Sequence, residues 1–271
     1  MWLAGAGALF FRSSSGWVSA GSTCAGEHHA AWARADGRVY FGTDDAGLRY
    51  TDPDAGSVCQ LLPTAALAGD VYGITGFVDA GTVVLYSVTI GGTVLRNTEP
   101  VLAAVDRRWD LADAGGKELW TVAGFNQSAL FAGGRSGAGA NGVIFKFNPA
   151  TDLWVRESVS INSVVNDISV VSPTLAFAGT EGHDLFIWNG AVWTLANNNM
   201  FGKAIYAVKA FGPNEVYATG ESALVRQFDG GTWLTLAAFD AGTTGYLARI
   251  RGLNSCDLWS AGTNGLVVHS Q

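Results

Sequence analysis

Apolar and polar residues alternate in short runs along most of the chain. Residues 143–147 (VIFKF), 205–211 (IYAVKAF) and 247–251 (LARIR) are clear examples. Alternation with a period of two is typical of β-strands, and the glycine-rich segments that separate the runs are typical of tight turns. The 36 glycines are scattered along the whole sequence. They disfavour helices, because each glycine costs a helix about 1 kcal/mol. We therefore expect an all-β fold.

The alternating runs belong to a repeated unit. It consists of an aromatic or aliphatic residue, two small residues, a glycine, a short turn, a strand rich in leucine or β-branched residues, and often a closing tryptophan. Clear copies cover residues 2–17, 177–193 and 216–233, and weaker copies cover 39–59, 84–109, 130–154 and 258–270. The central small residues, here called anchors, are Gly5, Gly42, Ser87, Gly133, Gly179, Gly220 and Gly262. Their spacing averages about 43 residues, within the roughly 40 to 50 typical of β-propeller blades.

Another alternating run precedes most anchors, so we expect four strands in each unit. A four-stranded antiparallel sheet with two apolar faces is stable only when it packs against similar sheets. Small residues in the first two strands suit the crowded centre of a ring of sheets, and tryptophans in the fourth strand suit its outside. We predict a single β-propeller domain of four-stranded antiparallel blades over residues 1–271.

The number of anchors favours seven blades over the alternative of six. The first unit lacks a strand before its anchor and the last lacks a fourth strand, so both terminal units are expected to be incomplete. We expect these two units to be neighbours where the ring closes. The start of the sequence looks as though a longer parent chain had been cut.

Two segments resemble blades of known propeller families. Residues 133–154 (GGRSGAGANGVIFKFNPATDLW) resemble a kelch blade, in which a glycine pair precedes an aromatic residue and then a tryptophan. Residues 229–233 (DGGTW) resemble the Asp-box of sialidase-type propellers, with one residue fewer than its usual spacing. Strands such as VYATG followed by FDGGTW are similar to repeats of bacterial secreted propellers and of the propeller that assists photosystem assembly. These resemblances imply the architecture and assign no residue a role.

Charge and composition exclude several classes of partner. The formal net charge of −7, from 16 basic and 23 acidic residues, argues against nucleic acid as a partner. The few lysines do not cluster, which disfavours an anionic membrane surface, and no apolar run is long enough for membrane insertion.

Residues 1–11 have the same order of residue types as residues 258–268, so they are expected to be part of the fold rather than a secretion signal. We expect an extracellular, periplasmic or cell-surface protein whose export signal is absent from this chain.

The cysteines allow two interpretations. Cys24 and Cys59 flank one repeat unit, so they are candidates for a disulfide in an oxidising compartment, with Cys256 left over. Three unpaired thiols are an equally good interpretation of the spacing.

Three motifs that suggest cofactors are better interpreted as turns. Residues 137–142 (GAGANG) match Gly-x-Gly-x-x-Gly, but a strand follows where a dinucleotide site requires a helix, so a hairpin turn is favoured. Residues 27–29 (EHH) suggest a metal, but adjacent residues on a strand point to opposite faces, so a solvated loop is favoured. Asp44-Asp45 and residues 181–184 (EGHD) lack the spacing of a calcium loop. We expect no metal site and no cofactor, with a structural cation as the one exception that the acidic loops allow.

Fold analogy places the candidate binding face. In propellers the loops between the second and third strands, and those between the fourth strand and the next blade, open together at the mouth of the central channel and usually hold the ligand. The polar residues in the predicted loops are Glu27, His28, Asp44, Asp45, Arg135, Asn141, Glu181, His183, Asn197, Asn198, Asn199, Glu221 and Asn264.

Trp188 lies close to Trp193 in the sequence and could form an outward platform for sugars. We favour packing in the core for this side chain.

The acidic and amide-rich character of these loops supports three functional hypotheses. The favoured one is a non-enzymatic binding or scaffold propeller that engages a protein or a glycan through this face. The second is a propeller hydrolase or lyase in which Glu181 and His183 act as an acid–base pair. The third is a structural repeat module of a larger surface protein. We expect the first.

Overall fold

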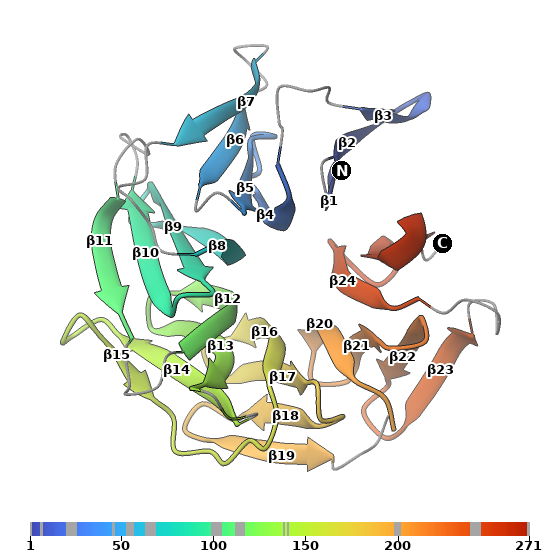
Figure 1. Cartoon of the computed structure of the whole chain (residues 1–271). Helices are drawn as coiled ribbons and strands as arrows, with labels where there is room; N and C mark the ends of the chain where they lie inside the picture. Colours follow the sequence, from blue (N-terminus) through green and yellow to red (C-terminus); the bar gives the residue numbers. More distant parts are fainter. Residues whose placement is uncertain are drawn as a thin grey trace. The chain divides into compact units, whose positions relative to one another are not determined.

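The chain is almost wholly β-structure in the computed structural model (Figure 1). The structure describes residues 2–5, 8–19, 26–44, 47–52, 57–62, 69–98, 105–111, 117–137, 139, 141–197, 202–238 and 245–269. Over these ranges it contains 26 strands and one short 3-10 helix, η2 (Thr263–Gly265). No helix in the described ranges has the length and apolarity needed to cross a membrane. The predicted all-β class is confirmed.

The strands form seven antiparallel sheets, five with four strands and two with three. We number these sheets as blades 1 to 7 along the chain. Blade 1 contains β1 (Trp2–Gly5), β2 (Ala8–Ser13) and β3 (Gly16–Ser19). Blade 2 contains β4 (His28–Ala33), β5 (Val39–Thr43), β6 (Leu48–Asp52) and β7 (Ser57–Leu62). Blade 3 contains β8 (Val71–Asp79), β9 (Thr82–Thr89), β10 (Thr93–Thr98) and β11 (Val105–Asp110). Blade 4 contains β12 (Lys117–Asn126), β13 (Ala129–Ser136), β14 (Gly142–Asn148) and β15 (Leu153–Arg156). Blade 5 contains β16 (Val165–Ser172), β17 (Leu175–Thr180), β18 (Leu185–Trp188) and β19 (Trp193–Asn197). Blade 6 contains β20 (Ile205–Gly212), β21 (Glu215–Gly220), β22 (Leu224–Phe228) and β23 (Trp233–Ala238). Blade 7 contains β24 (Leu247–Gly252), β25 (Leu258–Gly262) and β26 (Val267–His269).

Each sheet corresponds to one repeat unit of the sequence. Every anchor lies in the strand predicted to carry it: β1, β5, β9, β13, β17, β21 and β25. Blades 1 and 7 have three strands each, β1–β2–β3 and β24–β25–β26. The prediction of a propeller with seven blades and two incomplete terminal sheets is therefore confirmed over the six-blade alternative.

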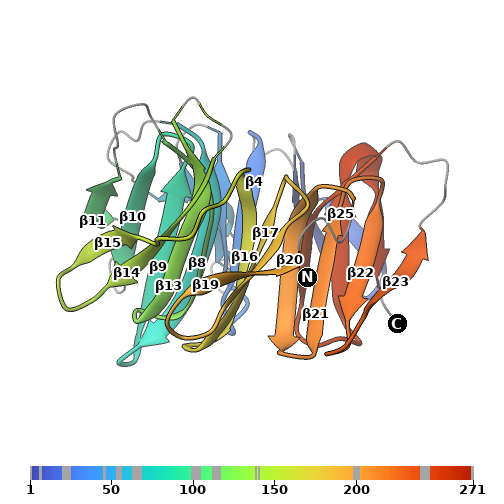
Figure 2. The same cartoon turned by 90° about the horizontal axis from the view of Figure 1, so that it is seen from below.

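Contacts divide the chain into two compact units, unit 1 (Met1–Val122) and unit 2 (Ala123–Gln271), with the boundary inside β12. In each unit the hydrophobic core lies between consecutive blades. In unit 1, Tyr40 and Leu48 of blade 2 pack with Val71 and Leu85 of blade 3. In unit 2 the same arrangement joins blade 5 to blade 6, and Figure 2 shows β20, β21 and β22 of blade 6 running side by side.

The anchor glycines allow the close approach of a neighbouring blade. A Cβ on Gly42 would lie 2.5 Å from the carbonyl oxygen of Val71, the first residue of blade 3. A Cβ on Gly179 would lie 2.5 Å from Cγ2 of Ile205, the first residue of blade 6. Real Cβ atoms do not come this close to other heavy atoms, so a side chain at either anchor would push the next blade away.

Tryptophans in the fourth strands of blades 4 and 5 are buried. Trp154 in β15 and Trp193 in β19 are 9% and 5% exposed. Trp188 is 2% exposed, packs against Phe131, and donates its indole N–H to the carbonyl of Pro173 at 3.1 Å. The preference for packing over an outward sugar platform is confirmed for Trp188.

The Asp-box-like segment forms a turn between β22 and β23. Oδ1 of Asp229 accepts the N–H groups of Gly231 at 2.9 Å and Thr232 at 2.8 Å. These two bonds stabilise the carboxylate and lower the pKa of Asp229. An aspartate that satisfies its own turn in this way is a structural residue.

The cysteine pattern agrees in part with the predicted pair. Cys59 is disulfide-bonded, whereas Cys256 is a free, exposed thiol. The other predicted member of the pair, Cys24, lies outside the described residues.

Candidate functional site

A recurring hydrogen bond brings the two kinds of predicted loop to the same end of blades 2, 3, 5, 6 and 7. The first residue of the loop between the second and third strands donates its N–H to a backbone carbonyl. That carbonyl belongs to the residue directly before the first strand of the same blade. The pairs are Asp44–Glu27, Ile90–Asp70, Glu181–Val164, Glu221–Ala204 and Thr263–Tyr246, at 3.0–3.2 Å. We call this end of each blade the loop end. The two loop types therefore meet within these five blades, as fold analogy led us to expect.

The predicted residues are distributed over the loop ends of several blades. Glu27, Asp44, Asn141, Glu181, Glu221 and Asn264 are exposed there, and Arg135 is half-buried near the end of β13. Asn197 closes β19. Asp45, Asn198 and Asn199 lie outside the described residues.

The two histidines at the start of blade 2 differ from the expected solvated loop, because both belong to β4. His28 is 4% exposed, and its ring lies edge-on to Phe41 with the centroids 5.7 Å apart. Burial lowers the pKa of His28, since the charged form loses its hydration. His28 therefore contributes no surface to the loop end. The register of the strand overrides the polar character of the sequence at this point.

His183 supports the turn between β17 and β18. Its φ is +76°, and its N–H donates to the carbonyl of Thr180 at 3.3 Å. Non-glycine residues adopt this left-handed conformation in tight turns. The acid–base pairing of Glu181 and His183 stays a prediction. Within the described ranges, no group of three or more histidine, cysteine, aspartate or glutamate side chains is placed to hold a metal ion.

A β-bulge recurs at the loop end of the first strand of the blades. Near the start of the first strand, the register with the second strand skips one residue in blades 2, 3, 5, 6 and 7, and blades 5 and 6 have a second shift near the end of that strand. The residues skipped near the start are His29, Tyr72, Asn166, Tyr206 and Ala248. A bulge redirects the side chain of the extra residue and often lies beside a functional site. In the described ranges, blades 2, 3, 5, 6 and 7 thus each present one redirected side chain at the loop end.

In unit 2, the bulge residue Tyr206 forms an aromatic pair with Tyr246, the residue directly before β24. The rings of Tyr206 and Tyr246 lie 4.9 Å apart between centroids. Tyr246 is 40% exposed, and its backbone forms a β-bridge with Glu221. Burial raises the pKa of Tyr206, and the nearby carboxylates of Glu181 and Glu221 raise it further. The tyrosine pair therefore lies in a negative potential.

Neither tyrosine was among the predicted site residues, although both carboxylates were. The signal in the sequence is an aromatic or histidine residue at the start of the first strand. It recurs as His29, Tyr72 and Tyr206. The alternating pattern assigns these residues to the strand, and only the bulge makes them part of the loop end.

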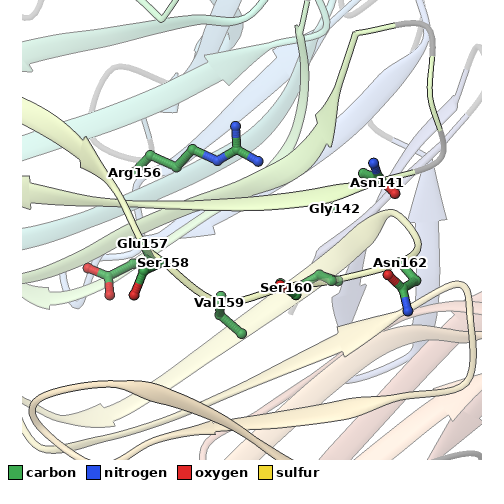
Figure 3. A pocket seen from close by; sticks show the side chains of 9 residues that line it. Asn141, Gly142, Arg156, Glu157, Ser158, Val159, Ser160 and Asn162 are labelled. Carbon is green, nitrogen blue, oxygen red and sulfur yellow. The ribbon is translucent and has the colours of Figure 1, made fainter.

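A polar hollow lies beside the loop end of blade 4 (Figure 3). Two backbone bonds define it: Glu157 N–H to the carbonyl of Ile144, and Gly142 N–H to the carbonyl of Ile161, both at 2.9 Å. Five residues, 157–161, thus lie opposite three of β14, and residues 158–160 bulge outward. The hollow has a volume of about 450 Å³, which falls in the range of ligand pockets.

The lining of this hollow is hydrophilic. Figure 3 shows Asn141 and Asn162 at one end and Glu157 at the other. Burial raises the pKa of the Glu157 carboxyl, while Lys146 acts in the opposite direction. Of the predicted residues, Asn141 contributes to the hollow. The arrangement suits a polar ligand more than an apolar one.

Comparison with known proteins identifies the fold. The structure of YCF48 bound to D1 peptide has a TM-score of 0.72 and 14% sequence identity, over 100% of this chain and 87% of that one. The WD40 β-propeller domain of Doa1 has a TM-score of 0.72 and 15% identity, over 98% and 86%. YCF48 from Cyanidioschyzon merolae has a TM-score of 0.71 and 14% identity, over 100% and 90%. The chain has the fold of a β-propeller. No protein-family model and no curated protein sequence matches it.

Proposed function

We propose that the chain is a non-enzymatic binding propeller whose unit 2 loop end binds a protein segment that carries a basic side chain. The observation that supports this is the pair Tyr206 and Tyr246, with Glu181 and Glu221 beside it. A lysine or arginine over a tyrosine ring gains about 0.5 to 2 kcal/mol, and adjacent carboxylates add to the attraction.

The solved neighbours support a protein partner. One of them is described as YCF48 bound to D1 peptide, so a propeller of this shape holds a peptide in that case. A glycan is the other partner that the polar loops suggest. We favour protein because the two carboxylates at the tyrosine pair select for positive charge, which most sugars lack.

A peptide library that varies charge at a single position tests the proposal. We expect peptides with lysine or arginine to bind, and their neutral analogues to bind about tenfold more weakly, since about 1.4 kcal/mol corresponds to a factor of ten. Tyr206→Leu and Glu221→Gln should each weaken binding. Higher salt should do the same, because the attraction is partly electrostatic.

The matched control is Glu215→Gln, which removes one carboxylate from the same blade at the other end of β21. It should leave peptide affinity unchanged. The proposal fails if a glycan array yields saturable ligands while charged and neutral peptides do not bind. It also fails if Glu221→Gln and Glu215→Gln have the same effect.

We also propose that the protein works outside the reducing cytosol, because disulfides such as that of Cys59 persist in oxidising compartments. Fractionation of producing cells, with non-reducing mass spectrometry of the peptide that contains Cys59, tests this. A fully reduced Cys59 in protein from the native compartment would contradict it.

A further inference from the structure

Three charged side chains lie on the first strands of three consecutive blades in unit 2. They are Asp167 of β16, Lys209 of β20 and Arg251 of β24. Oδ2 of Asp167 accepts Nη1 of Arg251 at 3.1 Å and the backbone N–H of Val208 at 3.1 Å. The Asp167 side chain is 3% exposed and that of Arg251 is 54% exposed. The carboxylate is thus buried, and one of its cationic partners reaches solvent.

Positive charge exceeds negative charge in this cluster. Lys209 places its ammonium 4.9 Å from the centroid of the Phe211 ring. In the part of the chain that the structure describes, this ammonium has no hydrogen bond or ion pair. Burial lowers the pKa of Lys209, Arg251 lowers it further, and Asp167 opposes both with a smaller effect. The lone carboxylate therefore does not neutralise the two cations.

Arg251 also has donors to spare. Its Nη1 donates to Asp167 and to the carbonyl of Ile250 at 2.7 Å, which accounts for both hydrogens of that nitrogen. Nη2 and Nε remain for another acceptor. A half-buried ammonium without a hydrogen bond or ion pair is costly, and a bound anion reduces that cost.

We propose that Lys209 and Arg251 bind a small oxyanion, either a carboxylate or a phosphate, beside the first strands of blades 6 and 7. The ammonium supplies a point charge, and the free edge of the guanidinium supplies directed N–H donors. Asp167 holds Arg251 in place and repels anions from its own side of the cluster. The site is separate from the tyrosine pair, whose carboxylates attract cations, so neither proposal depends on the other.

Competitive acetylation of lysines, read by peptide mass spectrometry, tests the site directly. The protein is labelled in rising sodium phosphate at constant ionic strength, with sodium chloride as the balancing salt, and the series is repeated with acetate. A bound anion holds the ammonium in its charged, unreactive form. We expect saturable protection of Lys209 and no protection of Lys203, an exposed lysine on the approach to β20.

The two series identify the anion class. Saturable protection by both anions indicates a carboxylate-type site, and protection by phosphate alone indicates a phosphoryl group. Arg251→Met should raise the half-protecting concentration by about tenfold, the effect of losing one charge-assisted hydrogen bond. Lys203→Met should leave it unchanged.

The labelling of the unmodified protein decides the outcome even if a variant does not fold. Protection that rises linearly without saturation, that chloride reproduces, or that is equal at Lys203 and Lys209 overturns the proposal. An Arg251→Met protein with the wild-type protection curve overturns it as well.

Discussion

The first strands of the blades in units 1 and 2 share a β-bulge, but the side chains at the bulge differ between the two units. In unit 1 the redirected residues His29 and Tyr72 form a row of rings with Trp120 of β12. His29 stacks on Tyr72 with the centroids 4.3 Å apart, and Tyr72 contacts Trp120 edge-to-face at 5.0 Å. In unit 2, Asn166 instead donates its side-chain N–H to the carbonyl of Ile205 at 2.8 Å. The tyrosine pair, with its carboxylates, lies one blade further along the chain.

The residue after each bulge extends the contrast. It is Ala30 and Gly73 in unit 1, whereas in unit 2 it is Asp167, Ala207 and Arg249, two of which are charged. Rings that pack on one another offer a ligand little polar contact, whereas charged side chains at the same position can form ion pairs and hydrogen bonds. The bulge is therefore a property of the fold, and the chemistry that it presents is a property of the individual blade.

The largest expected effect comes from removing the buried carboxylate of unit 2. Asp167→Ala leaves the N–H of Val208 without its acceptor and Arg251 without its partner. We expect a loss of about 2 to 3 kcal/mol in the free energy of unfolding, below the value for a fully buried pair because Arg251 is half exposed. Urea unfolding of the variant measures it. Asp167→Asn, which keeps an acceptor, should lose less, and equal losses would contradict this account.

A smaller effect is expected from the row of rings in unit 1. Tyr72→Ala removes two aromatic contacts, each worth about 0.5 to 1.5 kcal/mol. We expect a loss of about 2 kcal/mol in thermal or urea unfolding. Tyr72→Phe keeps both rings in contact and should be nearly neutral. If Tyr72→Phe were as unstable as Tyr72→Ala, the hydroxyl rather than the stack would stabilise this row.

The smallest expected effect is a dependence of stability on pH that originates in unit 1. Burial lowers the pKa of His28 in the folded state from its ordinary value of 6.5. Below pH 6.5 the unfolded chain binds a proton that the folded chain does not, so stability falls as the pH falls toward the lowered pKa. The slope contributed by this group is at most about 1.4 kcal/mol per pH unit.

Unfolding free energies at pH 8 and pH 5.5 test the assignment to His28. The loss on acidification should be smaller in His28→Leu than in the wild type. An identical loss in the wild type and in His28→Leu would exclude His28 as its source.

Much of the fold could be predicted because the constraints on it are local and repeated. An anchor such as Gly42 or Gly179 must be small wherever the next blade approaches, so the spacing of anchors reports the number of blades. Tryptophans such as Trp154 recur in the fourth strand because the same volume must be filled in each blade. Neither constraint depends on contacts that are distant in the sequence.

The candidate site could be predicted only in part, because it depends on the direction of side chains and on pairs from different blades. Polar loop residues such as Glu181 and Glu221 stand out in the sequence. Tyr206 is hidden in an alternating strand until the bulge redirects it. The pairing of Asp167 with Arg251 spans 84 residues, and no local pattern announces it.

The fit of one blade's anchor against the next blade's first residue has a consequence for how such chains diversify. Because Gly42 is matched to Val71 and Gly179 to Ile205, a cut between two sheets would separate surfaces that had adapted to each other. A cut inside a sheet, between its first and second strands, would keep each matched pair together. The heritable module of this protein is therefore a segment that begins at one anchor strand and ends with the first strand of the following sheet. Recombination and blade duplication should respect that frame, rather than the outline of the sheets.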